Sequence, residues 1–92
     1  QVYHVSYNVL KTYPNPFNPA INIEITSVEE LIVDVSIISF SGQFVESIFK
    51  GKIFNSTQTI SWEPENLSSG IYLVRLINDK NQSRYKKITY LK

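Results

Sequence analysis

The stretch LIVDVSIISFSGQFVESIF, residues 31–49, indicates the fold class, because its apolar residues recur with a period of two. Every second position from Leu31 to Ile37 is apolar, so these side chains share one face of an extended segment. A second alternating run, residues 43–49, follows the pair Ser41-Gly42, which is typical of a hairpin turn with glycine at positive φ. The stretch therefore predicts two antiparallel strands joined by a tight turn.

The same alternation continues on both sides of this hairpin, and no window shows helical apolar spacing of useful length. Further strands are expected at residues 20–26, 56–62, 71–78 and 83–92, with a leader at 3–11 and turns at 50–52, 63–70 and 79–82. Residues 71–78 are apolar on both faces, which predicts a central strand that is covered on both sides or crosses the core. The pattern predicts an all-β, immunoglobulin-like antiparallel β-sandwich of about seven strands, with the sheet order left open.

The length of 92 residues allows one domain. We expect residues 1–12 to be a linker or leading strand and residues 13–92 to form the sandwich. The first ten residues lack the features of a signal peptide, and the absence of an initiator methionine suggests an excised domain. No run of 18 apolar residues exists, so no transmembrane segment is expected.

The net charge is +1, and charges of both signs are scattered along the chain, which argues against a nucleic-acid or membrane partner. The last thirteen residues are mildly basic. The simplest interpretation of these cations is solvated strand residues that protect a sheet edge. Cysteine is absent, so neither a disulfide nor a cysteine-based zinc site can form.

The segment YPNPFNP, residues 13–19, stands directly before the first clearly alternating strand. Its prolines fix their own φ and push the preceding residues toward extended conformations. Asn15 and Asn18 are expected to cap local backbone groups in Asx turns. The segment should therefore be stiff and non-helical, and we expect Phe17 to plug one end of the sandwich and lock the first strand's register.

Catalytic constellations are absent from the sequence. His4 is the only histidine, and no G-x-S-x-G elbow or phosphate-binding glycine loop exists. Glu63 and Glu65 flank a proline and form at most a weak candidate cation site. We expect no enzyme activity, no cofactor and no metal. Triplets of the N-x-[ST] pattern begin at Asn55, Asn66 and Asn81, and we interpret them as chance matches.

Aromatic residues could instead form a platform that stacks on sugar rings. The candidates are Trp62, Tyr72, Tyr85 and Tyr90. For Trp62 and Tyr72 the alternating pattern favours core packing over ligand stacking, whereas Tyr85 is left open.

Several short motifs occur in a fixed order. They are YPNPFNP at 13–19, FSGQFV at 40–45, Trp62, LSSGIYLVRL at 67–76 and KKITYLK at 86–92. This set resembles the C-terminal sorting domain of type IX secretion cargo, type A family, from about Tyr13 to Lys92. The family's acidic position in the hairpin is taken here by Ser39 or Ser41, which leaves the turn's internal hydrogen bonding open, while Gly42 is kept.

The resemblance implies a folded address tag rather than an enzyme. In such cargo the domain is recognised in the periplasm by the outer-membrane translocon and its shuttle protein. A sortase-like cysteine protease removes many such domains by a cut upstream, here before about Tyr13, and joins the cargo to a surface anchor. The expected locations are the periplasm in transit and then the cell surface or the medium, and we expect a monomer.

The motif positions give the candidate recognition residues. They are Pro14, Asn15, Pro16, Phe17, Asn18, Pro19, Gly42, Gly70, Tyr72, Lys86, Lys87 and Lys92. Our hypothesis is that residues 84–92 and the proline-rich segment form the recognised surface, with the terminal strand used either as an edge for strand addition or as a side-chain surface.

Two other functions fit the same fold class, because fold alone does not determine function. One is a carbohydrate-binding module appended to an extracellular hydrolase, which micromolar polysaccharide binding through Trp62 or Tyr85 would favour. The other is an immunoglobulin-like structural spacer, which would tolerate loss of its last strand as long as it still folded.

Overall fold

The computed structural model describes residues 8–92, which form seven β-strands and no helix. The strands are β1 (Asn8–Tyr13), β2 (Ile21–Ser27), β3 (Leu31–Ser39), β4 (Phe44–Ile53), β5 (Ser56–Trp62), β6 (Gly70–Asn78) and β7 (Ser83–Tyr90). Within this part of the chain there is accordingly no apolar helix of membrane-spanning length.

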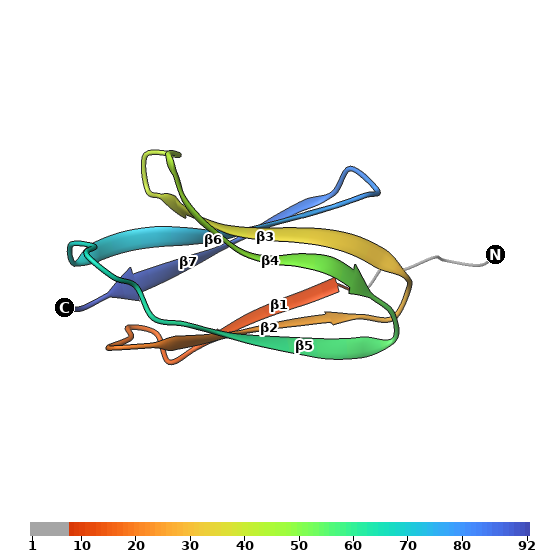
Figure 1. Cartoon of the computed structure of the whole chain (residues 1–92), viewed down its shortest axis with the longest axis horizontal. Helices are drawn as coiled ribbons and strands as arrows, with labels where there is room; N and C mark the ends of the chain where they lie inside the picture. Colours follow the sequence, from red (N-terminus) through yellow and green to blue (C-terminus); the bar gives the residue numbers. More distant parts are fainter. Residues whose placement is uncertain (1–7) are drawn as a thin grey trace.

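The strands form two antiparallel sheets that pack face to face (Figure 1). One has the order β1-β2-β5 and the other the order β4-β3-β6-β7. This confirms the predicted all-β sandwich and supplies the sheet order that the sequence left open. Residues 8–12 belong to β1, so this part of the N-terminal stretch is a leading strand. His4 and most of the stretch without signal-peptide features lie outside the described residues.

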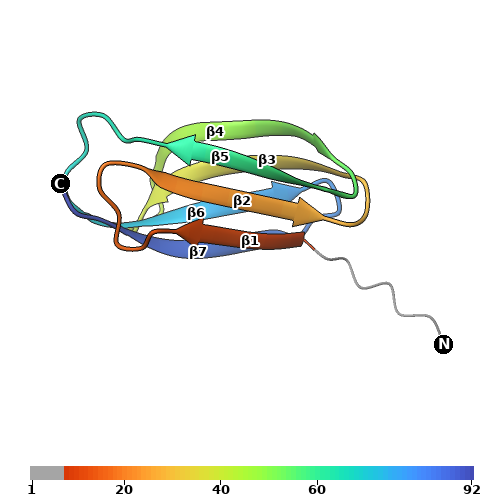
Figure 2. The ribbon, with the colours of Figure 1, turned by 90° about the horizontal axis from the view of Figure 1, so that it is seen from below.

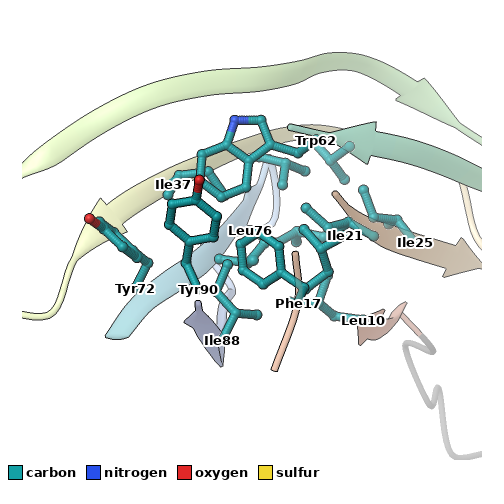
Figure 3. Packing of buried hydrophobic residues seen from close by; sticks show 14 of the residues in the cluster. Leu10, Phe17, Ile21, Ile25, Ile37, Trp62, Tyr72, Leu76, Ile88 and Tyr90 are labelled. Carbon is teal, nitrogen blue, oxygen red and sulfur yellow. The ribbon is translucent and has the colours of Figure 1, made fainter. Parts of the chain in front are cut away.

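Alternate side chains of the strands fill the space between the sheets. Ile21, Ile23 and Ile25 of β2 are fully buried and face Val33, Val35 and other buried residues of the four-stranded sheet. Figure 3 shows side chains from both sheets meeting in this cluster. Because each buried aliphatic side chain contributes about 1.5–3 kcal/mol relative to an exposed one, this core is the main source of stability.

The turn predicted at residues 50–52 is wrong. Strand β4 runs through Gly51 to Ile53, and the chain turns at the following residues, where Asn55 has φ of 47°. Gly51 lies beneath the ring of Phe49, because a Cβ at this glycine would stand 3.3 Å from the ring. The glycine therefore marks a strand position covered by an aromatic ring, and not a chain reversal.

For β6 the predicted central position is confirmed, and of the two alternatives given for it, cover on both sides is wrong. β6 is central in its sheet, between β3 and β7, and its inward residues Val74 and Leu76 are fully buried. Its other face points away from the sandwich, and Ile71 and Ile77 there are 38% and 39% exposed. The apolar pattern of β6 thus reports one core face and one uncovered face.

The two ends of the sandwich differ in what they carry (Figures 1 and 2). One end gathers the proline loop (residues 14–20), the β3–β4 turn, the loop before β6 and the C-terminal residues. The opposite end carries the start of β1 and the turns that follow β2, β4 and β6. The first of these ends holds most of the residues that the sequence motifs single out.

Candidate recognition site

The proline loop is hydrogen-bonded along the outer edge of β7. The amide of Phe17 donates to the carbonyl of Thr89 at 2.9 Å, and the amide of Leu91 donates to the carbonyl of Phe17 at 3.1 Å. These bonds form an isolated parallel bridge between Phe17 and Tyr90. Residues 72 or more positions apart in the chain are thereby joined at one edge of the four-stranded sheet.

Asn15 extends this pairing with its side chain. Its Nδ2 donates to the carbonyl of Lys87 at 3.1 Å, and its Oδ1 accepts the amide of Thr89 at 3.0 Å. The carboxamide therefore bonds the β7 backbone as a neighbouring strand would. The predicted local Asx cap at Asn15 is wrong, because the long-range strand edge offers this amide both a donor and an acceptor.

Phe17 closes the sandwich at this end, as predicted. Its side chain is 1% exposed and lies among residues of both sheets (Figure 3). Its ring stacks on Tyr90 with centroids 5.2 Å apart and is tilted against Trp62 at 5.9 Å. Aromatic pairs at these separations are attractive beyond the area they bury, so Phe17 fixes the loop to the core.

The remaining loop residues point to solvent and give the site its outer surface. Pro14, Pro16, Asn18 and Pro19 are exposed, and the three X-Pro bonds of the loop are cis. Lys86 and Lys87 are exposed on β7. The site thus combines a rigid apolar loop with a basic strand beside it.

The C-terminal residues are attached to the loop that precedes β6. The amide of Lys92 donates to Ser69 Oγ at 2.8 Å. Tyr72 is buried, and its hydroxyl donates to the carbonyl of Ser68 at 2.7 Å, which holds the same loop against the core. Gly70 begins β6 at this point. The structure therefore brings Gly70, Tyr72 and Lys92 together at the end that carries the proline loop.

Gly42 lies at the same end of the molecule, in the β3–β4 turn, and has φ of 94°. Its amide donates to the carbonyl of Ser39 at 2.9 Å. Ser39 Oγ accepts the amide of Gln43 at 3.0 Å and lies 2.9 Å from Ser41 Oγ. A serine hydroxyl here supplies the side-chain acceptor of the turn, which answers the open question of its internal hydrogen bonding.

Tyr13 joins the loop to the three-stranded sheet. Its hydroxyl donates to Glu24 Oε2 at 2.6 Å. The bond to the Glu24 carboxylate, with smaller effects of burial and of the negative charge, raises the pKa of Tyr13 above 10.0. The phenol therefore stays protonated and donates this hydrogen bond at neutral pH, which fixes the position where β1 enters the proline loop.

The described residues offer little for chemistry of their own. Residues 8–92 contain no group of three or more His, Asp and Glu side chains placed to hold a metal ion, and no pocket. Trp62, Tyr72 and Tyr90 are buried, and Trp62 Nε1 donates to Glu46 Oε1 at 3.1 Å. Only Tyr85 of the four aromatic sugar-platform candidates is exposed, at 56%. The arrangement is suited to recognition by shape and surface.

Sequence reasoning missed the pairing of Asn15 with β7 and the bond of Ser69 to Lys92. Nothing in the local sequence marks either contact, because both depend on which segments the folded sheets bring together. The available sequence signal for these contacts was the order of the motifs, with a proline segment first and a strand motif last.

Comparisons with known proteins address the identity of the chain. The sequence pattern of the family described as "Secretion system C-terminal sorting domain" matches residues 11–90. No match was found among curated proteins. The fold is similar to part of the solved structure of dimeric latent PorU from Porphyromonas gingivalis, with a TM-score of 0.73 and 21% identity.

That similarity covers 98% of this chain but 10% of the PorU chain. At this identity it shows the fold alone, and it agrees with the seven-stranded sandwich described above. The family match extends over nearly the whole chain and agrees with the resemblance that the ordered motifs showed. The chain belongs to the family of secretion system C-terminal sorting domains, and its role is that of a sorting signal.

Proposed function

We propose that this domain directs a cargo protein through the type IX outer-membrane translocon and that its shuttle protein reads the end formed by the proline loop and the C-terminal strand. The main support is the hydrogen-bonded closure of residues 15–17 on β7. It fixes residues from both ends of the domain in one rigid surface. A tag that is read as a fold needs such a surface and no reactive group.

The closure favours one of the two recognition modes considered for β7. Between Lys87 and Leu91 the outward backbone groups already bond to Asn15 and Phe17. A partner strand could pair there only after displacing the proline loop and Phe17 from the core. We therefore propose recognition through the exposed side chains of the loop and of β7, and not through strand addition.

A protease cut, if the domain is removed, belongs ahead of Asn8. β1 pairs with β2 along its whole length, and Leu10 lies in the core cluster. A cut directly before Tyr13 would remove this strand from the sheet. A sortase-like cysteine protease acting upstream of β1 would instead release an intact domain and leave the cargo ready for its anchor.

Deletion of the last five residues would be an ambiguous test of the sorting role, because it would not separate sorting from folding. Ile88 and Tyr90 are buried, and Leu91 and Lys92 bond to neighbouring loops. A truncated domain would lose core contacts together with any recognition signal. Substitutions of exposed side chains are therefore the sharper test.

The test fuses a fluorescent reporter ahead of the whole chain in a bacterium that has type IX export. We expect the wild-type fusion to reach the cell surface or the medium. Asn18→Ala, and Lys86→Gln with Lys92→Gln, should leave the reporter in the periplasm without lowering the thermal midpoint of the domain. The matched control, Lys11→Gln with Lys80→Gln, removes two exposed lysines from other parts of the fold and should be exported normally.

Retention of the wild-type fusion in the periplasm would contradict the sorting role itself. Normal export of both site variants would place recognition elsewhere on the fold.

A further inference from the structure

The outer faces of the two sheets differ in polarity. On the three-stranded sheet, Asn22, Glu24 and Thr26 of β2 point outward and pair with Ser61, Thr59 and Thr57 of β5. This is the polar surface expected of an antiparallel sheet with one face in water. The four-stranded sheet does not follow this rule.

The outer face of the four-stranded sheet carries several exposed apolar side chains among polar ones. Register places Ile77, Arg75 and Leu73 of β6 beside Asp34, Ser36 and Ile38 of β3. We define the apolar face by six residues, Ile32, Phe44, Ile71, Leu73, Ile77 and Tyr85. Of these, Ile32, Phe44 and Tyr85 are more than half exposed, and Ile71 and Ile77 are over a third exposed. Register places these side chains on either side of Arg75, and exposed apolar side chains gathered on one face of a folded domain mark an interaction surface.

Arg75 lies in the middle of this face and indicates the charge of the partner. Its Nη2 donates to Ser36 Oγ at 3.3 Å, while its Nε is buried without a hydrogen-bond partner in the described part of the chain. Leu73 and Ile77 flank it on the same face of β6, and Tyr85 pairs with it from β7. A guanidinium among apolar side chains has unused donors, and a carboxylate is the group that best satisfies them.

The other charges on this face leave a positive balance. Lys50 pairs with Asp34 at 3.8 Å and Lys52 pairs with Glu30 at 3.7 Å, so the β4 side is balanced. Arg75 and Lys87 take part in no ion pair among residues 8–92. Lys87 stands opposite Leu73 in the register, on the outer side of β7.

We propose that the apolar face docks a folded protein of the export machinery whose own apolar patch carries carboxylates opposite Arg75 and Lys87. The inference rests on the proposed function for the identity of that partner. A second copy of this chain fits poorly, because pairing two such faces would bring like charges together. A bilayer fits poorly as well, because Arg75 and Lys87 are the two unpaired cations described on this face, whereas binding to a membrane surface draws on clusters of several Lys and Arg side chains.

The test uses the same reporter fusion with the whole chain. The double variant Ile71→Thr/Ile77→Thr keeps β-branched residues in β6 but removes apolar surface. The matched control, Val28→Thr/Phe54→Thr, removes exposed apolar side chains in the turns that follow β2 and β4, outside the apolar face. Arg75→Glu reverses the central charge, Arg75→Lys keeps it, and Lys11→Glu is the control reversal on the other sheet.

We expect export to fall at least about tenfold for Ile71→Thr/Ile77→Thr and for Arg75→Glu, as the loss of an interface anchor gives. Export of Arg75→Lys should lie between that of Arg75→Glu and that of wild type, and both controls should be exported normally. Circular dichroism and thermal midpoints identify variants that fail to fold. If the isoleucine variant fails to fold, Arg75→Glu carries the test.

Normal export of the folded Arg75→Glu and isoleucine variants would overturn the inference and leave the sorting role intact. Failure of the wild-type fusion would instead remove the proposed function on which the partner's identity rests. Two further results would overturn the choice of partner. One is a dimer of the purified chain in sedimentation that Arg75→Glu dissociates, and the other is binding to phosphatidylglycerol vesicles that Arg75→Glu abolishes.

Discussion

Phe17 is the single residue on which the closed end of the sandwich most depends. It is 1% exposed, its ring contacts Tyr90 and Trp62, and its backbone bonds to Thr89 and Leu91. Its ring thus belongs to the core, while its neighbours in the sequence lie in solvent.

Replacing Phe17 by alanine should lower the free energy of unfolding by about 3–5 kcal/mol, because a buried ring is lost and a cavity is left. Phe17→Leu should lose less, since leucine refills part of that volume. Urea unfolding followed by tryptophan fluorescence measures both, and Trp62 beside the ring makes the probe local. Phe54→Ala, at a ring that is 62% exposed, is the control and should change stability by no more than about 0.5 kcal/mol. Equal losses at the two positions would contradict the packing described here.

Tyr13 predicts a pH dependence on the alkaline side. Its pKa is raised in the folded chain by the bond to Glu24, so the protonated phenol is favoured by folding. The stabilising contribution is therefore complete below the ordinary tyrosine pKa and is lost as the pH rises through the folded value. The stability difference between wild type and Tyr13→Phe should be constant at neutral pH and shrink above about pH 10. Urea unfolding across that range checks this, and a difference that grows with pH would exclude the bond.

Three asparagines have a conformational role that was not predicted from the sequence. Asn55, Asn66 and Asn81 have positive φ, at 47°, 57° and 61°. They are also the first residues of the three N-x-[ST] triplets that the sequence led us to treat as chance matches. Asparagine tolerates the left-handed conformation better than other residues with a side chain, so tight turns supply a structural reason for all three.

At the scale of elements, period-two alternation was enough to predict most strands and the Ser41-Gly42 hairpin. It was insufficient at residues 50–52, because a glycine between two lysines has the composition of a turn, and only the covering ring of Phe49 shows otherwise. It was also insufficient for β7, whose edge is closed by a segment far away in the sequence. Local pattern reports local conformation and carries no information on distant pairing.

The pairing between Asn15 and β7 gives a prediction for hydrogen exchange. The amides of Thr89 and Leu91 face the proline loop, whereas those of Ile88 and Tyr90 face β6. In Asn15→Ala the Thr89 amide should exchange about fivefold faster, as loss of about 1 kcal/mol of local hydrogen bonding gives.

The Ile88 amide should be unchanged in this variant, and Asn18→Ala, an exposed asparagine of the same loop, should leave all of these amides unaffected. Exchange resolved residue by residue by nuclear magnetic resonance makes the comparison. An unaltered Thr89 rate would mean that the carboxamide does not close the edge.

At the scale of the whole molecule, the sequence predicted the sandwich but not its asymmetry. The apolar residues on both sides of β6 suggested a strand that is covered on both sides or crosses the core, since a sequence cannot tell a buried apolar face from an exposed one. Sheet order, and with it the gathering of distant motifs at one end, depends on long-range packing of the complete fold. The candidate residues were therefore named from the sequence, while their arrangement was not.

The domain boundary gives a prediction at this scale. The fragment 13–92, which we expected to form the sandwich, lacks nearly all of β1 and therefore exposes the edge of β2. It should unfold at lower urea concentration than the whole chain and associate as its concentration rises. Urea unfolding and sedimentation measure the two properties. A monomeric fragment as stable as the whole chain would show that β1 is dispensable.

The opposite placement of the start of β1 and the C-terminal residues has a mechanical consequence (Figure 2). A passenger joined ahead of β1 is tethered to the end farthest from the proline loop, so even a bulky one leaves that loop unobstructed. Pulling on the tether while the C-terminal residues are held would load the antiparallel strands in shear, the direction in which many hydrogen bonds must break together. Resistance to this load would let one small domain carry passengers of very different size through export without becoming detached from them.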